Sequence, residues 1–361
     1  MRINRCSRRA LCALLLFPVG IVHADAGHGA PRADSHAPIG VMGEHVHESG
    51  EFMVSYRYMR MAMAGNRIGT ERVSPEFIVQ NVPNRFAGQP MQPPTLRVVP
   101  LEMTMEMHML GAMVAPTDRT TLMAMVPVLS SDMTHVTFAG GMGTERLGRF
   151  ETTSSGIGDV GLSALFRVRQ WADGQLVGKL GVRLPTGDVD DTDTVLSPMD
   201  TRPELRLPYP MQTGSGTFAL TPGLTWRHGT GAVGWGAQYA GTLQLGRNDE
   251  GYSRGDEHVL SAWGSYLWAP WISTSVRAEA STRARIDGID SEIRAPVQTA
   301  NPDFQGGDRV DAGIGVNLLG TRGALAGHRM AVEYMVPVHQ DLNGPQLETD
   351  SVLTVGYQYA W

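Results

Sequence analysis

Hydrophobic and polar residues alternate along much of the chain, most clearly in short segments bounded by turn residues. Between residues 160 and 168, one face carries Val160, Leu162, Ala164, Phe166 and Val168, and the other carries mostly polar residues or glycine. A period of two places successive side chains on opposite faces of a β-strand. The pattern resumes over residues 176–184 after a turn around 173–174. The two segments therefore predict a β-hairpin with one apolar face.

Similar alternation divides residues 51–361 into about twelve segments. Short connections alternate with long ones, and the long ones lie near residues 64–95, 129–156, 187–214, 246–257, 287–307 and 340–350. This order is typical of bacterial outer-membrane barrels, which have short periplasmic turns and long outer loops. The sequence therefore predicts an all-β fold, a single transmembrane antiparallel up-and-down β-barrel of about 12 strands, with both termini periplasmic.

A soluble β-sandwich is the structural alternative, since it also has short strands between turns. Its strands usually contain about 5 to 6 residues, whereas the segments here approach the roughly 9 to 11 residues that a tilted membrane strand needs. Arginine also recurs on the predicted inner face of strand after strand. Both features favour the membrane barrel.

Both ends of the sequence carry features of an exported protein. Four arginines precede the apolar run 10–22, and Val22-His23-Ala24 fits a cleavage site, so residues 1–24 are expected to be a cleaved signal peptide. The alternating segment 351–361 ends on Trp361 and resembles the closing strand of Gram-negative outer-membrane barrels. That resemblance implies recognition by the barrel-assembly machinery and a place in outer-membrane lipid. The predicted location is the bacterial outer membrane.

Composition narrows the chemistry of the mature chain. Cys6 and Cys12 both lie within the predicted leader, which excludes disulfides and thiolate catalysis after cleavage. Losing four arginines and no acidic residue takes the formal charge from -6 to -10, which argues against a nucleic-acid partner. No G-x-S-x-G, H-E-x-x-H or phosphate-binding loop occurs, so the chain is not expected to be an enzyme.

Methionine is concentrated in the first part of the predicted barrel, with fourteen of the twenty between residues 53 and 142. In the first strand, the greasier face holds Phe52 and Tyr56, so Arg57 and the row Met59, Met61 and Met63 are expected to face the lumen. Lumen thioethers would suit Cu(I) as soft ligands, or would simply fill space.

In the second strand the opposite assignment is predicted. Glu102, Glu106 and His108 share one face, which we assign to the lumen, and the methionines at 103, 105, 107 and 109 are assigned to the lipid face. The full predicted set of lumen-lining residues is Arg57, Glu102, Glu106, His108, Arg167, Arg169, Lys179, Arg183, Arg227, Arg277, Glu279, Arg283, Arg285, Arg309, Asp311 and Glu333.

Histidines cluster ahead of the barrel, in a segment 25–50 that is expected to be a flexible periplasmic N-terminal region. It contains His28, His36, His45 and His47. The spacing of His45 and His47 suits Cu(II) or zinc, and scattered histidines on a flexible terminus are the alternative. The candidate metal ligands are therefore His45, His47, Met59, Met61 and Met63, copper is the one candidate cofactor, and no other cofactor is predicted.

Three sequence motifs carry a resemblance to a known family. They are the segment 155–160 (SGIGDV), the segment 184–187 (LPTG), and the segment 207–217 (LPYPMQTGSGT) followed by 222–225 (PGLT). Over residues 56–361 the chain resembles the outer-membrane transporter family named for the meta-pathway of phenol degradation. The Met-rich stretch 56–63 is similar to a branch associated with copper and heavy-metal handling. The resemblance implies a barrel that passes a solute.

The function predicted from the sequence is passage or export of a small solute, either an aromatic compound or a metal ion such as copper. Two rivals remain open at this point. An outer-membrane hydrolase would need a serine or carboxylate beside His108 or His339, and a periplasmic metal-binding β-protein would use the histidine-containing segment.

Overall fold

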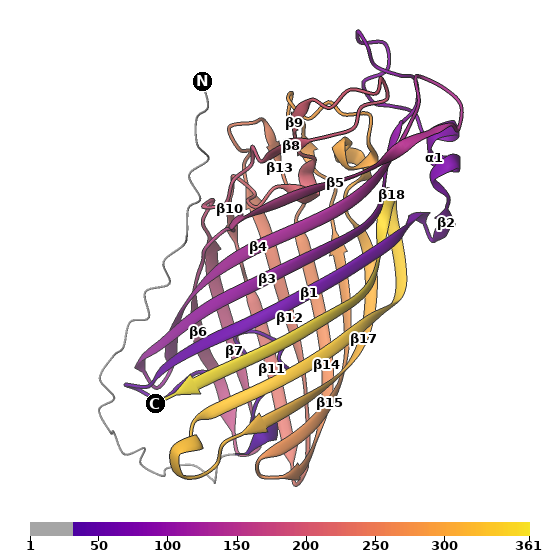
Figure 1. Cartoon of the computed structure of the whole chain (residues 1–361). Helices are drawn as coiled ribbons and strands as arrows, with labels where there is room; N and C mark the ends of the chain where they lie inside the picture. The colour runs from indigo at the N-terminus through magenta and orange to yellow at the C-terminus, as the bar shows by residue number, and fades with distance from the viewer. Residues whose placement is uncertain (1–31) are drawn as a thin grey trace, which may run out of the picture.

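The computed structural model describes residues 32–361, and the predicted signal peptide and His28 lie outside the described residues. Almost all regular structure is β (Figure 1). In chain order the elements are η1 Ala33–Ser35, β1 Phe52–Gly69, β2 Glu71–Val73, α1 Pro75–Asn81, β3 Val98–Thr117, β4 Thr120–Phe138, β5 Arg146–Ile157, β6 Gly161–Trp171, β7 Gly174–Arg183, β8 Thr192–Thr194, β9 Glu204–Arg206, η2 Tyr209–Met211, β10 Phe218–Leu220, β11 Gly223–Thr230, β12 Val233–Leu245, β13 Tyr252–Ser253, β14 Glu257–Ala269, β15 Ile272–Arg283, β16 Asp287–Gly288, η3 Gln298–Ala300, η4 Pro302–Phe304, β17 Gly307–Leu319, η5 Gly323–Leu325 and β18 His328–Ala360.

One antiparallel sheet closes on itself to form a barrel. The ring runs β1-β3-β4-β6-β7-β11-β12-β14-β15-β17-β18 and returns to β1, which gives eleven strands. Because every strand has two neighbours, the ring leaves no open edge. This architecture confirms the prediction of an all-β up-and-down barrel.

The last strand, β18, crosses the barrel wall twice. Residues 329–342 pair with β17 and residues 342–360 pair with β1, both antiparallel, so the chain must reverse near Leu342. Counting its two arms separately, the barrel has twelve passes. The seam is completed at the lower rim in Figure 1, where Phe52 and Trp361 exchange backbone hydrogen bonds of 3.0 Å in both directions.

Two passes are each built from a pair of short strands. β4 pairs first with β5 and then, beyond an interruption at residues 158–160, with β6. In the same way β7 pairs with both β10 and β11. The interruptions contain Gly158 and Pro222, and proline cannot donate to the ladder. The sheet is therefore irregular on this side of the barrel.

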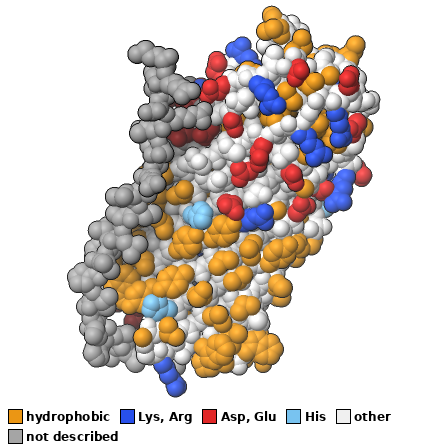
Figure 2. All heavy atoms as spheres, in the orientation of Figure 1, with side chains coloured by type: hydrophobic (Ala, Val, Ile, Leu, Met, Phe, Trp, Pro, Cys, Tyr) orange, Lys and Arg blue, Asp and Glu red, His pale blue; other side chains and the backbone are white. Residues whose placement is uncertain are grey.

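The outer surface carries the apolar residues, as a lipid-facing barrel requires. Ile314 is 66% exposed and Leu180 is 57% exposed, and both point away from the lumen. In Figure 2 hydrophobic side chains cover the lower part of the visible face, and charged side chains gather above them. Aromatic side chains, among them Trp268, Trp271 and Trp361, lie at the lower ends of strands, as in an interfacial girdle. Within residues 32–361, no helix is long and apolar enough to cross a membrane.

Two segments that the sequence predicts as outer loops are mostly strand. Residues 129–156 belong mostly to β4 and β5, and residues 340–350 lie within β18. In both places the paired strands extend above the band of exposed apolar side chains. A strand there needs no apolar residues on its outer face, so it lacks the alternating pattern from which strands are predicted. The remaining loops cover the upper end of the barrel, where a cluster that includes Phe150, Tyr209, Tyr252 and Ile293 is buried.

Candidate functional site

The segment that precedes the barrel lies inside it. At one end of this segment Ala33 N–H donates to Pro270 O at 2.9 Å, and at the other Gly50 N–H donates to Ala115 O at 2.8 Å. Pro270 and Ala115 both lie at the lower ends of barrel strands. Residues 32–50, which we call the plug, therefore enter and leave the lumen at the lower rim of the barrel in Figure 1.

Polar side chains from around the ring hold the plug through its backbone. Arg329 Nη2 donates to Ala37 O at 2.6 Å, Gln238 Nε2 donates to Met42 O at 2.8 Å, and Arg167 Nη2 donates to Val46 O at 3.1 Å. These residues come from β18, β12 and β6. The plug is thus fastened on several sides, whereas the sequence predicts a flexible periplasmic segment.

Gly40 fits the plug against the wall formed by β15 and β18. A Cβ atom at this position would collide with the Arg277 guanidinium and the Glu333 carboxylate. Those two side chains are themselves joined by an ion pair, with Arg277 Nη2 2.6 Å from Glu333 Oε1. A buried pair of this kind resists displacement, because separating it leaves an uncompensated charge. Position 40 therefore requires glycine.

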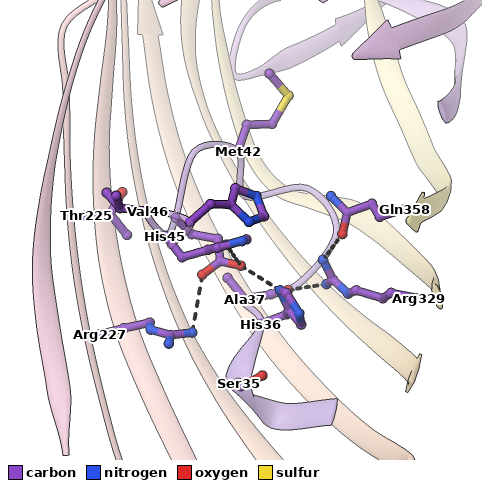
Figure 3. A network of polar contacts seen from close by, with 12 residues as sticks. Ser35, His36, Ala37, Met42, His45, Val46, Thr225, Arg227, Arg329 and Gln358 are labelled. Carbon is purple, nitrogen blue, oxygen red and sulfur yellow. Dashed lines mark hydrogen bonds and ion pairs between the residues drawn. The ribbon is translucent and has the colours of Figure 1, made fainter. Parts of the chain in front are cut away.

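A polar cluster forms the centre of the plug (Figure 3). Glu44 is only 4% exposed, and its Oε1 lies 3.1 Å from His36 Nδ1 and 2.8 Å from His45 Nδ1. Its other oxygen, Oε2, accepts from Arg227 Nη1 of β11 at 3.3 Å. Burial opposes ionisation of Glu44, but His45, His36 and Arg227 outweigh burial and hold the pKa of the Glu44 carboxyl well below its usual value. Glu44 is therefore ionised in place.

Burial favours the neutral form of two plug histidines, His36 and His47. Burial, reinforced by the charge of Arg329, lowers the pKa of His36 from 6.5 to about 3, and Glu44 offsets only part of this effect. Burial also lowers the pKa of His47, whose ring packs edge-on against His45 with centroids 4.6 Å apart. A neutral imidazole keeps one ring nitrogen available as an acceptor or a metal ligand.

These pKa values predict that acid loosens the plug. A released His36 would titrate near its ordinary value of 6.5, whereas the docked side chain stays neutral down to about pH 3. Below pH 6.5 the released form therefore gains a proton that the docked form lacks, and docking weakens by at most about tenfold per pH unit. Glu44 acts in the same direction, since its contribution to docking is present above pH 4.5 and is lost at lower pH. Bilayer currents recorded at pH 7.5 and 5.5 should rise on acidification, and His36→Gln should flatten that response.

Methionines form one wall of the lumen. Twelve of them, from β1, β3 and β4, project inward, and we call this set the methionine wall: Met53, Met59, Met61, Met63, Met103, Met105, Met107, Met109, Met113, Met123, Met125 and Met133. The strand registers place Met53, Met113 and Met123 side by side across three strands, and likewise Met63, Met103 and Met133.

The methionine wall runs between the plug and the outer loops. At its lower end Met53, Met113, Met123 and Met125 surround a small pocket against plug residues 41–45. At its upper end Met103 and Met133 pack against Leu207 and Met211 of the loop that folds into the barrel mouth. The wall therefore lines the lumen from the plug up to the loop that contains Leu207 and Met211.

The predicted orientation of the second strand, β3, was wrong, because its lumen-facing and outward-facing sides are interchanged. Glu102, Glu106 and His108 point outward from β3, and the methionines at 103, 105, 107 and 109 point inward. The outward polar groups are satisfied by neighbours on the same surface. The Tyr58 hydroxyl donates to Glu106 at 2.6 Å, and the Tyr56 hydroxyl lies 2.7 Å from His108 Nδ1. On β1, Met53 is 2% exposed and shares the inner face with Arg57, Met59, Met61 and Met63, the face that the sequence assigns to the lumen.

Paired charges form the adjoining wall, on β15, β17 and β18, because β18 pairs with β1. Arg277 bridges Glu333 and Glu279, and Arg309 Nε lies 2.9 Å from Asp311 Oδ2. Other predicted lumen residues that face inward are Arg57, Arg167, Lys179, Arg183 and Arg227. Arg283 shares the inward face of β15 with Arg277 and Glu279 and pairs with Glu257 at 2.6 Å, although it is exposed at the strand end. Arg169 and Arg285 instead lie exposed, near a strand end and in a loop.

The structure brings together a different set of possible metal ligands from the one predicted from sequence, namely His36, Glu44 and His45. His45 and His47 are adjacent in the plug, but His45 shares Glu44 with His36, which spacing alone did not single out. The methionines at 59, 61 and 63 lie on β1, whereas the pocket that contains His45 is lined by Met53, Met113 and Met125. The candidate catalytic residues His108 and His339 are both exposed, and neither belongs to the lumen.

A cavity of about 780 Å³ opens below the plug, at the same end of the barrel as Pro270. It is lined by His36, Arg227, Trp171, Trp235 and Trp263, among others. The cavity gives solvent and solutes access to the underside of the plug.

The three sequence motifs meet at the interrupted side of the barrel. Asp159 accepts from the backbone N–H of Gly187 at 3.1 Å and from the Ser215 hydroxyl at 2.6 Å, and Thr186 Oγ1 donates to Gly158 O at 2.8 Å. Gly187 and Gly214 approach so closely that a Cβ on either would strike the other's backbone. The motifs therefore build the wall junction between β5 and β10.

Comparisons with known proteins place the fold. No protein-family model matches the chain, and no curated protein matches it. An outer-membrane channel from Pseudomonas putida F1 is similar in structure, with a TM-score of 0.54 and 12% identity over 88% of this chain and 98% of that chain.

More distant likenesses include the β domain of the Bordetella autotransporter BrkA, with a TM-score of 0.45 and 10% identity over 87% of this chain and 100% of that chain. A mutant of the TodX monoaromatic hydrocarbon channel gives a TM-score of 0.41 and 9% identity over 87% of this chain and 91% of that chain. The resemblance to the phenol meta-pathway family stays a prediction. The similarity to the P. putida channel shows that this chain has the fold of an outer-membrane β-barrel channel.

Proposed function

We propose that this protein is an outer-membrane channel that passes a small, largely apolar solute, such as an aromatic compound, along the methionine wall. The observation that carries the proposal is the wall itself, in which twelve thioethers face the lumen and line up across β1, β3 and β4. If these side chains only had to fill the interior of the barrel, they would not all need to be methionine along one side.

Thioethers suit an apolar, polarisable solute. The methionine side chain is flexible, carries no charge and makes favourable sulfur–aromatic contacts of about 0.3–1.5 kcal/mol. The adjoining wall presents charges that are already paired, so it offers hydrogen bonds without a strong preference for one sign of charge. A solute with an apolar body and a polar end matches both walls.

Passage through this route requires the plug to move. Plug residues 41–45 lie against the lower methionines, and Leu207 and Met211 cover the upper ones. In this proposal the arrangement is the closed state of the channel, and the cavity below the plug is one end of the route.

A soft metal ion is a second candidate solute, favoured by the cross-strand alignment of the sulfurs. Directly opposed residues on neighbouring strands have Cβ atoms about 4.5–5.5 Å apart, which lets the thioethers of Met53, Met113 and Met123 converge. Thioether ligands select Cu(I) among biological metals. The same wall thus supports either solute, and an experiment can separate them.

Replacing Met59, Met61 and Met63 together by leucine should distinguish the two solutes. Leucine keeps the packing volume but removes the sulfur donors. For an apolar solute we expect uptake of a monoaromatic compound into proteoliposomes to change by no more than about tenfold, since the sulfur–aromatic contribution that is lost is about 0.3–1.5 kcal/mol. For a soft cation, binding of Cu(I) to the purified barrel should fall sharply.

The matched control removes the same number of sulfurs from exposed loop positions, by replacing Met91, Met142 and Met199 with leucine. This control should behave as wild type in both assays. Failure of the wild-type protein to pass either an aromatic compound or Cu(I), even after acidification or removal of the plug, would refute the proposal.

A further inference from the structure

We infer that His36, Glu44 and His45 form a binding site for a divalent transition-metal ion, Zn²⁺ or Cu²⁺, which fastens the plug in the closed barrel. Their ligand atoms, one from each side chain, all lie within 4.8 Å of one another. The site is distinct from the methionine wall and does not depend on which solute the channel passes.

The donor set matches the chemistry of these ions. Two imidazoles and one carboxylate are a recurring set of three protein ligands for zinc, which keeps a further position for water. Cu²⁺ also accepts nitrogen and oxygen donors and generally binds such sites more tightly. A hard cation such as Ca²⁺ would instead need six to eight oxygens, and the cluster does not provide them.

The side chains are arranged around a shared point. Glu44 Oε1 lies between the two imidazoles, 3.1 Å from His36 Nδ1 and 2.8 Å from His45 Nδ1, and the two rings meet edge-on with centroids 5.0 Å apart. Small rotations of the rings would bring three ligand atoms to the spacing that a bound ion requires. The carboxylate is buried and the imidazole of His36 is neutral, which are the protonation states that metal binding needs.

A fourth group lies close to the cluster. His47 packs against His45, is 6% exposed, and its Nε2 has no hydrogen-bond partner within the described part of the chain. An unsatisfied buried nitrogen costs free energy. A modest shift of the plug, or a water on the ion, would give this nitrogen a partner.

The ion has a route to the cluster from the periplasm. His36 and Arg227 line the large lower cavity, while Glu44 and His45 line the small pocket beside the methionine wall. The cluster therefore separates the two spaces, and an ion bound there would link residue 36 to residues 44 and 45 across the turn of the plug. Such a link would disfavour unfolding of the plug into the periplasm.

Nearby arginines limit how tightly the ion binds. Arg227 shares Glu44 through Oε2 at 3.3 Å, and Arg329 reaches the adjacent backbone at Ala37. Both positive charges repel a cation, and Arg227 also competes for the carboxylate. This arrangement predicts a reversible site, and Arg227→Gln should bind the metal more tightly than wild type.

The test is calorimetric titration of the full-length mature barrel, purified in detergent without a polyhistidine tag, with ZnCl₂ and with CuCl₂ near pH 7.5. We expect one site per chain. His36→Gln and His45→Gln should each weaken binding by about 100-fold or more, since removing a direct ligand costs at least as much as removing a supporting group. His258→Gln, which changes an exposed histidine on the outer surface, should bind as wild type.

Electron paramagnetic resonance of bound Cu²⁺ provides a readout that does not depend on plug stability. The wild-type spectrum should show hyperfine structure from at least two nitrogens, and each histidine variant should lose one of them. Heat-modifiable migration in detergent gels confirms that every variant retains its barrel. The inference is overturned if wild type binds neither ion, or if both histidine variants bind as wild type does. Its failure would leave the channel proposal intact, because solute passage is measured separately.

Discussion

Removing residues 33–47 should turn a closed barrel into one that carries a sustained current. The plug crosses the lower lumen and is held by Arg329, Gln238 and Arg167, but it contributes nothing to the strand ladder. Its deletion should therefore leave the closed sheet intact. In planar bilayers we expect wild type to show brief or absent openings at neutral pH, and the deletion variant to show a large, long-lived step.

A point substitution offers a milder version of the same test. Gly40→Ala would push against the buried Arg277–Glu333 pair and should raise the frequency of opening. Gly161→Ala is the matched control, because the space around that position is open. If the deleted barrel stays closed, the loop containing Leu207 and Met211 must close the lumen by itself, and the gating role of the plug would be wrong.

Leu180→Arg should destabilise the barrel far more than Lys179→Arg. The two positions are adjacent on β7, but Leu180 faces lipid and Lys179 faces the lumen, where its side chain approaches Gly43 of the plug. Arginine on the lipid face near mid-depth costs about 2–4 kcal/mol, whereas arginine in place of an inward lysine keeps the charge. Unfolding in denaturant, followed by gel migration, should show the difference, and Val316→Arg should repeat it.

Inward glycines make poorer controls for this experiment. Added atoms at Gly181 would collide with Ser163 and Thr221, and at Gly315 a Cβ would lie 2.8 Å from Ser275 Oγ. Arginine at those positions would be harmful for steric reasons alone. Equal loss of stability in Leu180→Arg and Lys179→Arg would show that the two faces of β7 had been assigned wrongly.

Strand faces could be predicted from sequence only where the two faces differ in chemistry. On β1, aromatic and aliphatic residues from Phe52 to Tyr56 fixed the outer face, so the inward row of methionines followed. On β3, methionines occupy one face while Glu102, Glu106 and His108 share the other. Methionine suits either lipid or lumen, and the outward Glu106 is satisfied by Tyr58 of the neighbouring strand. Because side chains alternate with a period of two, one wrong choice inverted the whole strand.

The plug could not be predicted because its contacts are distant in sequence. Glu44 pairs with Arg227, and Ala37 accepts from Arg329. Residues 32–50 have no strand periodicity and few apolar residues, so local pattern favoured a flexible segment. The histidines were recognised from composition, but the carboxylate between His36 and His45 gains its role only when the segment folds back on itself.

The pairing of β1 with the second arm of β18 also constrains how the molecule can be assembled. This seam joins the earliest and latest strands of the barrel, so no intermediate that lacks β18 can be a closed ring. The plug is covalently continuous with β1 and already lies across the lumen. It is therefore expected to be enclosed as the seam forms, rather than threaded into a finished barrel. Assembly would then deliver the protein to the membrane already shut, and the bilayer would never be exposed to an open pore during insertion.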